Sequence, residues 1–285
     1  MFQLLLAGVL WGTIGIFVKT LTSLGADGAL ISFLRMFSAL LIALAFAVMK
    51  HGRNVILHDK RTIFFCFLLG LVSNGIFNIF YSYSISANGM GIACVLMYTA
   101  PVFTAAASAL IFHEKFSALK ISALALNIIG CVLTVTGGNL SAESLNVTGL
   151  LAGLGTGFCY GMAAVIGRLA GEKTDSLIVC TYSYFSASIF LMVFMRPDIS
   201  VAFGAPEIFG VGFLYGLIPT ALAYIVYYNS LKIIKDTGKV PVIASIEPVT
   251  AVLIGMTVYG EELGTANFAG VIVVLGSILI MARAK

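Results

Sequence analysis

Charged residues are scarce in this chain. Only 10% of its 285 residues are Asp, Glu, Lys or Arg, whereas about 25% is usual in a soluble domain. Because 60% of the residues are hydrophobic, much of the surface must face lipid rather than water. This composition excludes a disordered chain, and a net charge of +4 is too small to indicate nucleic acid as a partner.

Several kinds of chemical motif are missing as well. The five cysteines stand singly, without a CxxC pair, which excludes a secreted disulfide scaffold. All three histidines fall between apolar runs, so no catalytic or metal-ligating histidine set is expected inside them. The sequence has no Walker-type phosphate-binding loop and no Asp-rich pair that would hold a magnesium diphosphate. We therefore expect no cofactor and no metal, and a membrane-embedded enzyme is disfavoured.

Long apolar runs dominate what is present. Runs of about 20 residues, the length that spans a bilayer as a helix, are separated mostly by short connectors. The predicted spans are 2–18, 28–49, 62–83, 89–112, 121–137, 147–167, 177–195, 207–231, 240–259 and 266–282. No stretch is long enough for a soluble domain. The sequence thus predicts an all-α polytopic membrane protein with ten transmembrane helices in one membrane domain.

The basic residues are distributed unequally between the two sets of connectors. With ten spans both termini lie on one side, and the connectors of that side carry 13 of the 16 Lys and Arg residues. The other side holds only Lys19 and Arg196, while Arg35 falls inside a span. Short basic loops stay in the cytoplasm. We therefore predict a multi-pass plasma-membrane protein with both termini cytoplasmic.

An internal repeat of about 147 residues divides the chain into two halves, predicted as 1–140 and 141–285. The matching segments are Leu10-Trp11-Gly12 with Cys159-Tyr160-Gly161, Phe67 to Leu71 with Phe213 to Leu217, and Pro101-Val102 with Pro248-Val249. Each half holds five spans, and an odd number forces the second half to enter the membrane upside down. Two inverted five-helix repeats are typical of secondary transporters.

These features resemble the drug/metabolite transporter superfamily, specifically its EamA-type members. The similarity rests on the two five-helix halves, the Trp-Gly pair in the first helix, Arg35 near the start of the second, and a Pro-Val helix ending at a Glu turn in each half. His113-Glu114 departs from the usual Gly-Glu at that turn. The resemblance covers essentially the whole chain. It implies transport of a small molecule across a bacterial plasma membrane, without naming the substrate.

Two polar stripes occupy equivalent helices of the two halves. Asn74, Asn78 and Tyr81 share one face of the third helix, and a shift of 146 residues maps them onto a stripe in the eighth. That second stripe consists of Thr220, Tyr224 and Tyr227, with Tyr228 beside it. The stripes should face inward because polar groups are costly in lipid. They indicate either a substrate path, which we extend to Trp11 and Tyr98, or hydrogen bonds that join helices.

Two ionisable residues lie deep in the predicted spans. Arg35 sits about 10 Å below the outer end of its helix, and Glu247 about 10–15 Å from the inner end of its own. Both should face the bundle interior. One interpretation is a single structural ion pair between them. The other makes Arg35 an anchor or site residue and Glu247 a proton-coupling group or a counter-ion for a cationic substrate.

Three prolines within spans are candidate hinges, with a static kink as the alternative. Pro101, Pro219 and Pro248 each lack an N–H group and would free the carbonyl four residues earlier. A freed carbonyl in lipid needs another partner, so such positions tend to border a cavity.

The functional hypothesis is therefore a secondary transporter that works by alternating access. We expect export of amino acids or related amines, because aromatic, amide and carboxylate groups suit zwitterions and organic cations. The alternatives are a passive channel and, less favoured, a membrane-embedded enzyme. The expected partners are a small-molecule substrate, the lipid bilayer and protons as candidate coupling ions. The protein would act as a monomer or a homodimer.

Overall fold

The computed structural model describes residues 1–56, 59–139, 145–234, 236–262 and 264–284, and its regular elements there are all helical. The α-helices are α1 Phe2–Gly12, α2 Ile14–Ser23, α3 Gly28–His51, α4 Lys60–Gly70, α5 Phe77–Met97, α6 Ala100–Phe112, α7 Ala118–Thr136, α8 Val147–Gly171, α9 Ser176–Phe194, α10 Ser200–Gly204, α11 Glu207–Gly216, α12 Ala223–Ile233, α13 Val240–Ala244, α14 Ile246–Tyr259 and α15 Thr265–Arg283. Two π-helices, η2 Leu71–Ile76 and η3 Leu217–Leu222, and two 3₁₀ turns, η1 Gly52–Ile56 and η4 Thr237–Lys239, connect them. The predicted boundary between 140 and 141 lies outside the described residues.

The chain turns back on itself within α5. Gly89 has a φ of 84°, outside the helical range. The Tyr81 hydroxyl lies 3.0 Å from the Cys94 sulfur, whereas thirteen residues of straight helix would separate them by about 20 Å. The segments before and after Gly89 are therefore two antiparallel helices. The segment after Gly89 and the shorter helix α6 together form one crossing. With the segment before Gly89 and the eight other long apolar segments, this makes ten crossings within the described residues, as predicted.

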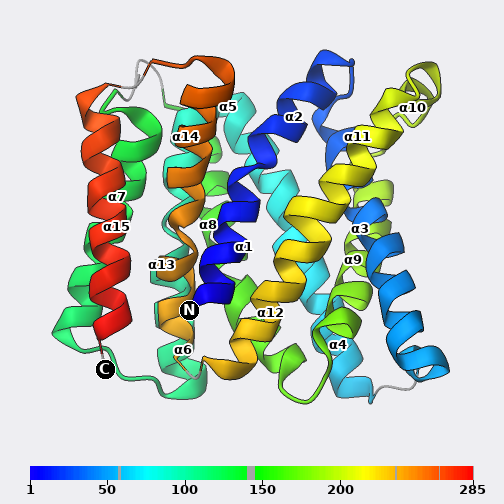
Figure 1. Ribbon diagram of the computed structural model, residues 1–285, viewed down its shortest axis with the longest axis horizontal. Coiled ribbons are helices and arrows are strands. Elements are labelled where there is room, and N and C mark those ends of the chain that lie inside the picture. The colour runs from blue at the N-terminus through cyan, green and yellow to red at the C-terminus, as the bar shows by residue number, and fades with distance from the viewer. Residues whose placement is uncertain (57–58, 140–144, 235, 263, 285) are drawn as a thin grey trace.

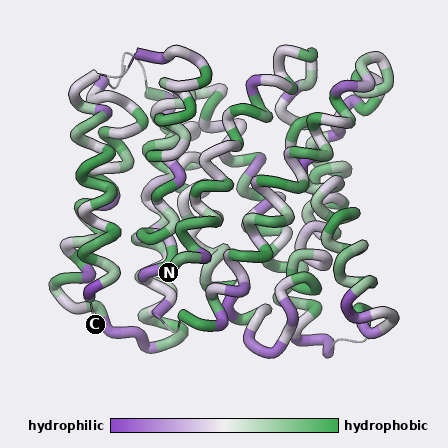
Figure 2. The backbone as a smooth tube through the Cα atoms, in the orientation of Figure 1, coloured by the Kyte–Doolittle hydropathy of each residue, from purple (hydrophilic) through white to green (hydrophobic). Residues whose placement is uncertain are grey.

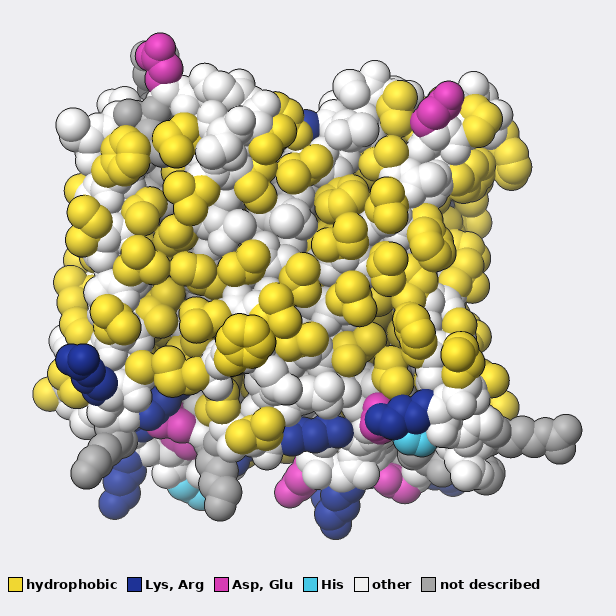
Figure 3. Space-filling model, viewed as in Figure 1, with side chains coloured by type: hydrophobic (Ala, Val, Ile, Leu, Met, Phe, Trp, Pro, Cys, Tyr) yellow, Lys and Arg dark blue, Asp and Glu magenta, His cyan; other side chains and the backbone are white. Residues whose placement is uncertain are grey.

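The two halves enter the bundle in opposite directions. Both chain ends lie at the same end of the bundle, and α1 runs away from that end while α8 runs toward it (Figure 1). Lys and Arg side chains gather at this end, whereas the middle of the bundle is apolar (Figures 2 and 3). We call it the basic end, and the other the opposite end. The inverted arrangement agrees with the predicted repeat.

Irregularities of the backbone recur at equivalent places in the two halves. The π-helices η2 and η3 start 146 residues apart, and the fourth and ninth crossings both break, at Tyr98–Thr99 and at Ser245. After each broken helix the chain adopts a left-handed conformation, at His113 with φ 54° and at Gly260 with φ 65°. His113 thus takes the strained conformation that glycine adopts in the second half.

The three prolines predicted to free a carbonyl within a span do not all do so. Pro101 and Pro248 lie in the first turns of α6 and α14, because the helices break before them. In a first turn the missing N–H interrupts no helical hydrogen bond. Only Pro219 lies inside a helix, and there the Thr220 hydroxyl donates to the Tyr215 carbonyl at 3.0 Å. The freed carbonyl expected at Tyr215 therefore has a partner.

Glycines bring the first helix of each half close to the broken helix of the other. A Cβ atom at Gly161 of α8 would overlap the Ala100 carbonyl oxygen, and one at Gly12 of α1 would overlap Thr250 of α14. The other α8 glycines at four-residue intervals, Gly149, Gly153 and Gly157, face α5 and the break that follows it. Small residues allow such close backbone approach in membranes. This packing joins the two halves face to face.

The fifth helices, α7 and α15, also meet at glycines and supply a test of this packing. A Cβ at Gly270 would overlap the backbone nitrogen of Thr134, while Gly276 in the same helix has open space around it. We expect Gly270→Ala to lower stability by about 1–3 kcal/mol through overpacking. Gly276→Ala should leave stability unchanged or slightly raised. Thermal unfolding in detergent measures both, and equal melting temperatures would contradict the close contact.

Candidate functional site

The two broken helices face one small cavity in the middle of the bundle. Tyr98 and Pro101 line it from the first half, and Ser245 and Glu247 from the second. Its volume is about 10 Å³, roughly the minimum that holds one water molecule. Asn127 of α7 also lines the cavity. Its amide donates to the Ser245 hydroxyl, so the polar side chain at the second break has a hydrogen-bond partner. The cavity between the broken helices is therefore too small for a metabolite in this conformation.

Glu247 is the acidic group of this cavity. It lies in the first turn of α14, where the positive end of the helix dipole favours a carboxylate. The Tyr160 hydroxyl of α8 donates to its Oε2 atom at 2.8 Å. The carboxylate of one helix is thus held by a phenol of another, and both groups border the cavity.

Six aromatic side chains form a cluster beside the carboxylate. The indole ring of Trp11 lies with its centroid 5.0 Å from that of Tyr224, 5.1 Å from that of Tyr227 and 6.3 Å from that of Tyr160. We call the aromatic cluster the set Trp11, Tyr160, Tyr184, Tyr224, Tyr227 and Tyr228. The Trp11 indole nitrogen and the Tyr228 hydroxyl are buried without a hydrogen-bond partner among the described residues. These unpaired groups are available to a ligand.

Helix α3 connects the two polar stripes. The Ser32 hydroxyl donates to Asn78 at 3.1 Å, and the Arg35 Nε donates to the Thr220 hydroxyl at 3.1 Å. Ser32 and Arg35 stand three residues apart, so they share one face of α3. The structure thus brings one member of each stripe to the same helix. Part of each stripe joins helices, and this part agrees with the alternative interpretation of the stripes.

The remaining stripe residues divide between the π-helices and the aromatic side chains. Asn74 lies within η2, its carbonyl accepts a hydrogen bond from the Asn78 amide, and its own amide nitrogen is buried without a partner among the described residues. Thr220 lies at the equivalent place in η3. Tyr81 bonds Cys94 and stacks on Phe77, whose ring lies 6.0 Å from that of Tyr160. Both stripes therefore approach the centre from opposite halves.

Arg35 and Glu247 are not joined to each other. Within the described residues Arg35 makes no ion pair; its guanidinium bonds Thr220 and lies 5.3 Å from the centre of the Tyr215 ring. Glu247 bonds Tyr160 instead. The single structural ion pair is thus not formed, and the two charges flank the aromatic cluster.

Comparison with known proteins decides the family. The sequence model of the EamA-like transporter family matches residues 1–136 and again residues 147–283. This chain belongs to the EamA-like transporter family. It is a membrane transporter rather than an enzyme, as the sequence predicts, and the two matches coincide with the two halves of the bundle.

Relatives of this EamA-like transporter extend over nearly the whole chain. An "Uncharacterized transporter" of Archaeoglobus fulgidus is 29% identical over 283 residues, 98% of this chain and 95% of that protein. The "Uncharacterized inner membrane transporter YicL" of Salmonella typhimurium is 22% identical over 99% of this chain and 94% of its own length. A solved crystal structure superposes with a TM-score of 0.80 at 15% identity, covering 98% of this chain and 94% of that one. This last likeness shows the shared fold.

Sequence reasoning missed some members of the site. Tyr160, Ser32 and Tyr184 were not expected there. Tyr184 belongs to the site because its hydroxyl donates to the Thr220 carbonyl. The repeat contains a signal for Tyr160, because aligning the first helices of the two halves gives Tyr160 the position equivalent to Trp11. Ser32 and Tyr184 have no such signal, since ordinary serines and tyrosines are common in membrane helices.

The bond between Tyr160 and Glu247 can be measured without knowing the substrate. Tyr160→Phe removes the donor and leaves the carboxylate unpaired, so we expect a loss of about 1.5–3 kcal/mol of stability. Combining it with Glu247→Ala, which removes the acceptor, in a double-mutant cycle should reveal a coupling energy between the two positions. Tyr83→Phe is the control, since its hydroxyl is exposed and bonds Thr148 away from the cluster. Additive effects of Tyr160→Phe and Glu247→Ala would exclude the bond.

Proposed function

We propose that this EamA-like transporter moves small zwitterionic or cationic metabolites, such as amino acids and amines, by alternating access. The observation that carries the proposal is the placement of a carboxylate and a guanidinium on two flanks of one aromatic cluster. Glu247 is held at one flank by Tyr160, and Arg35 at the other by Thr220.

The chemistry of each flank fits one part of such a substrate. An ammonium group is attracted both to a carboxylate and to the faces of Trp and Tyr rings, so it would lie near Glu247 and Trp11. A substrate carboxylate would accept hydrogen bonds from Arg35 and the Thr220 hydroxyl. An apolar side chain of the substrate would lie between the two charged residues and replace some of the ring–ring contacts within the aromatic cluster. An amine without a carboxylate would use the first flank alone.

The shape of the interior supports a carrier in preference to a passive channel. The cavity beside Glu247 holds about 10 Å³, which is room for about one water molecule and too narrow for a metabolite to pass in this conformation. Inverted halves provide two related conformations, each open to one side of the membrane. In liposomes a carrier shows saturation and counter-flow of substrate, whereas a channel shows neither.

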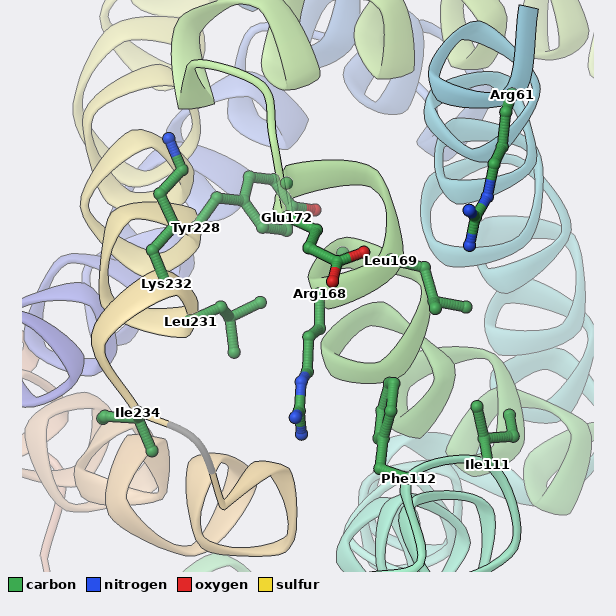
Figure 4. Close-up of a pocket in the computed structure, with 12 residues that line it drawn as sticks. Arg61, Ile111, Phe112, Arg168, Leu169, Glu172, Tyr228, Leu231, Lys232 and Ile234 are labelled. Carbon is green, nitrogen blue, oxygen red and sulfur yellow. The ribbon is translucent and has the colours of Figure 1, made fainter.

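Export is supported by a second, larger cavity at the basic end. This vestibule holds about 510 Å³ and is bordered by Arg61, Arg168, Glu172, Tyr228 and Lys232, among others (Figure 4). Its inner wall includes Tyr228, a member of the aromatic cluster. A substrate entering from the basic end would therefore meet the cluster at Tyr228. If that end faces the cytoplasm, substrate would load from the cytoplasm, as export requires.

The proposed location is the bacterial plasma membrane with the basic end in the cytoplasm. The relatives named as inner membrane transporters support the membrane, and the excess of Lys and Arg supports the orientation. Both chain ends would then be cytoplasmic.

Cysteine labelling in intact cells tests this orientation. Cysteines introduced at Lys60, Lys115 and Lys232, all exposed at the basic end, should be protected from an impermeant thiol reagent. A cysteine at Ser200, exposed at the opposite end, should react. The sequence places Ser141 on the same outer side, but it lies outside the described residues. Inside-out vesicles should give the reverse pattern, and reaction of all positions in intact cells would refute the orientation.

Glu247→Gln tests the role of the carboxylate. Glutamine keeps the size of the side chain and accepts the Tyr160 hydrogen bond but cannot ionise. We expect folded protein with at least a tenfold loss either of affinity for cationic and zwitterionic substrates or of uphill transport. A thermal-shift screen against amino acids, amines, nucleosides and drugs identifies the ligand used in the assay.

The two roles of Glu247 separate in reconstituted liposomes. A counter-ion role predicts that Glu247→Gln loses binding itself at every pH. A proton-coupling role predicts that substrate exchange persists while accumulation driven by a proton gradient is lost. Asp175→Asn, at the basic end, controls for loss of an acidic residue outside the cavity. Unchanged affinity together with unchanged uphill transport would remove Glu247 from the mechanism.

A further inference from the structure

Two ion pairs occupy opposite ends of the bundle and are related by the repeat. Lys19 pairs with Glu261 at 2.5 Å, and Arg168 pairs with Glu114 at 2.5 Å. The acids are 147 residues apart and the bases 149 apart, the same shifts that align the halves. Each pair joins the end of the first crossing in one half to the residue two positions after the broken helix in the other.

The likeness extends to an aromatic partner in each pair. The Lys19 ammonium lies 4.0 Å from the centre of the Tyr259 ring, and the Arg168 guanidinium 3.9 Å from that of Phe112. Tyr259 and Phe112 are again 147 residues apart, each two residues before its acid. Figure 4 shows Arg168 and Phe112 reaching into the vestibule from α8 and α6. We call Lys19, Tyr259 and Glu261 the outer latch.

The inner latch consists of Phe112, Glu114 and Arg168. Each latch joins the end of a broken helix to the first crossing of the other half. Each of these first crossings also carries one ring of the aromatic cluster. The inner latch connects the end of α6 with α8, which holds Tyr160. The outer latch connects the end of α14 with α2, which follows the helix of Trp11. A latch that opens therefore frees the two helices that close one end of the central cavity.

The two latches differ in strength. Glu114 accepts hydrogen bonds from the backbone N–H groups of Thr237 and Gly238 at 2.9 and 3.1 Å, and Arg168 also donates to the Thr237 hydroxyl at 2.6 Å. The side chain of Glu114 is only 11% exposed, whereas that of Glu261 is 51% exposed. For Glu261 the described residues show no equivalent bonds from the matching backbone at 90 and 91. Exposed pairs contribute little, so the inner latch is the more stable.

We propose that the inner and outer latches are the alternating gates of this transporter and that the protein rests closed more firmly at the basic end. The proposal rests on the alternating access proposed above. In the outward-open state the outer latch is broken and the inner latch kept, and in the inward-open state the reverse holds. The exposed outer latch opens more readily, so outward opening is the more frequent excursion in the absence of substrate.

The Glu114 carboxylate of the inner latch stays ionised near neutral pH. Partial burial raises the pKa of Glu114, but the N–H groups of Thr237 and Gly238 and the Arg168 guanidinium outweigh this effect and hold the pKa below its usual value. A carboxyl whose pKa is lowered on folding keeps its interaction above that pKa and loses it only as the pH falls through it. Near neutral pH the inner latch must therefore be opened by substrate or by movement of the halves.

A single thiol in the central cavity reports which gate opens. Ser245→Cys, placed in a background whose five native cysteines are replaced, lines the cavity beside Glu247 and is 6% exposed. An impermeant thiosulfonate reagent is added to intact spheroplasts or to inside-out vesicles, without substrate. Lys19→Ala should raise the reaction rate from the opposite end about two- to fivefold, the effect of losing an exposed ion pair, and Arg168→Ala should raise it at least tenfold from the basic end. Glu114→Gln, which keeps Arg168, serves where Arg168→Ala yields too little folded protein.

Two comparisons make the result specific. Lys50→Ala breaks another ion pair at the basic end, the one with Asp175, for which the described residues show no repeat-related equivalent, so neither rate should change. Exchanging the charges of the outer latch, Lys19→Glu with Glu261→Lys, should restore the low rate from the opposite end. Equal rates from both sides in Lys19→Ala and Arg168→Ala, or no restoration by the exchange, would overturn the proposal. Because the assay uses no substrate, it is independent of the outcome at Glu247.

Discussion

Every polar group of the backbone must find a partner inside the protein where lipid surrounds it, and this constraint governs the whole bundle. The breaks at Tyr98–Thr99 and Ser245 leave backbone groups outside the regular helical ladder. They are tolerated because each break is buried against the first crossing of the other half. Glycines such as Gly12 and Gly161 allow that approach. The two halves are thus bound to each other where each one is irregular.

Burial of the breaks also concentrates functional groups. A helix that restarts in mid-membrane presents its first turn to the interior, and Glu247 occupies that turn in α14. The neighbouring first crossings supply Trp11 and Tyr160, whose rings meet at 6.3 Å. The charged group, its phenol partner and the aromatic surface therefore meet because of the packing of the halves. The π-helices add Asn74 and Thr220 from the two sides.

The repeat is close to symmetric in backbone but not in chemistry. Both halves have a π-helix, a broken helix and a left-handed residue after it. Only the second half carries an acid beside the break, since the position that matches Glu247 in the first half is Ala100. Arg35 also lacks a charged counterpart. The helix caps Asp27 and Asp175 align with a shift of 148 residues, and this shift places Ser183 at the position equivalent to Arg35. A symmetric scaffold thus supports a polarised site, and the unequal latches extend the same asymmetry to the two ends.

The sequence alone determined the membrane class, the ten crossings, the two inverted halves and the family, because hydropathy and charge accumulate over some twenty residues and over whole connectors. It also found Trp11, Tyr224, Tyr227 and Glu247 as interior residues. Only the tertiary structure decided that α3 joins the stripes through Ser32 and Arg35, that Tyr160 holds Glu247, and that the helices break before Pro101 and Pro248. The first two depend on hydrogen bonds between residues distant in the chain. The third depends on a local break in the helix before each proline. Such contacts leave no periodic pattern, and packing alone selects them.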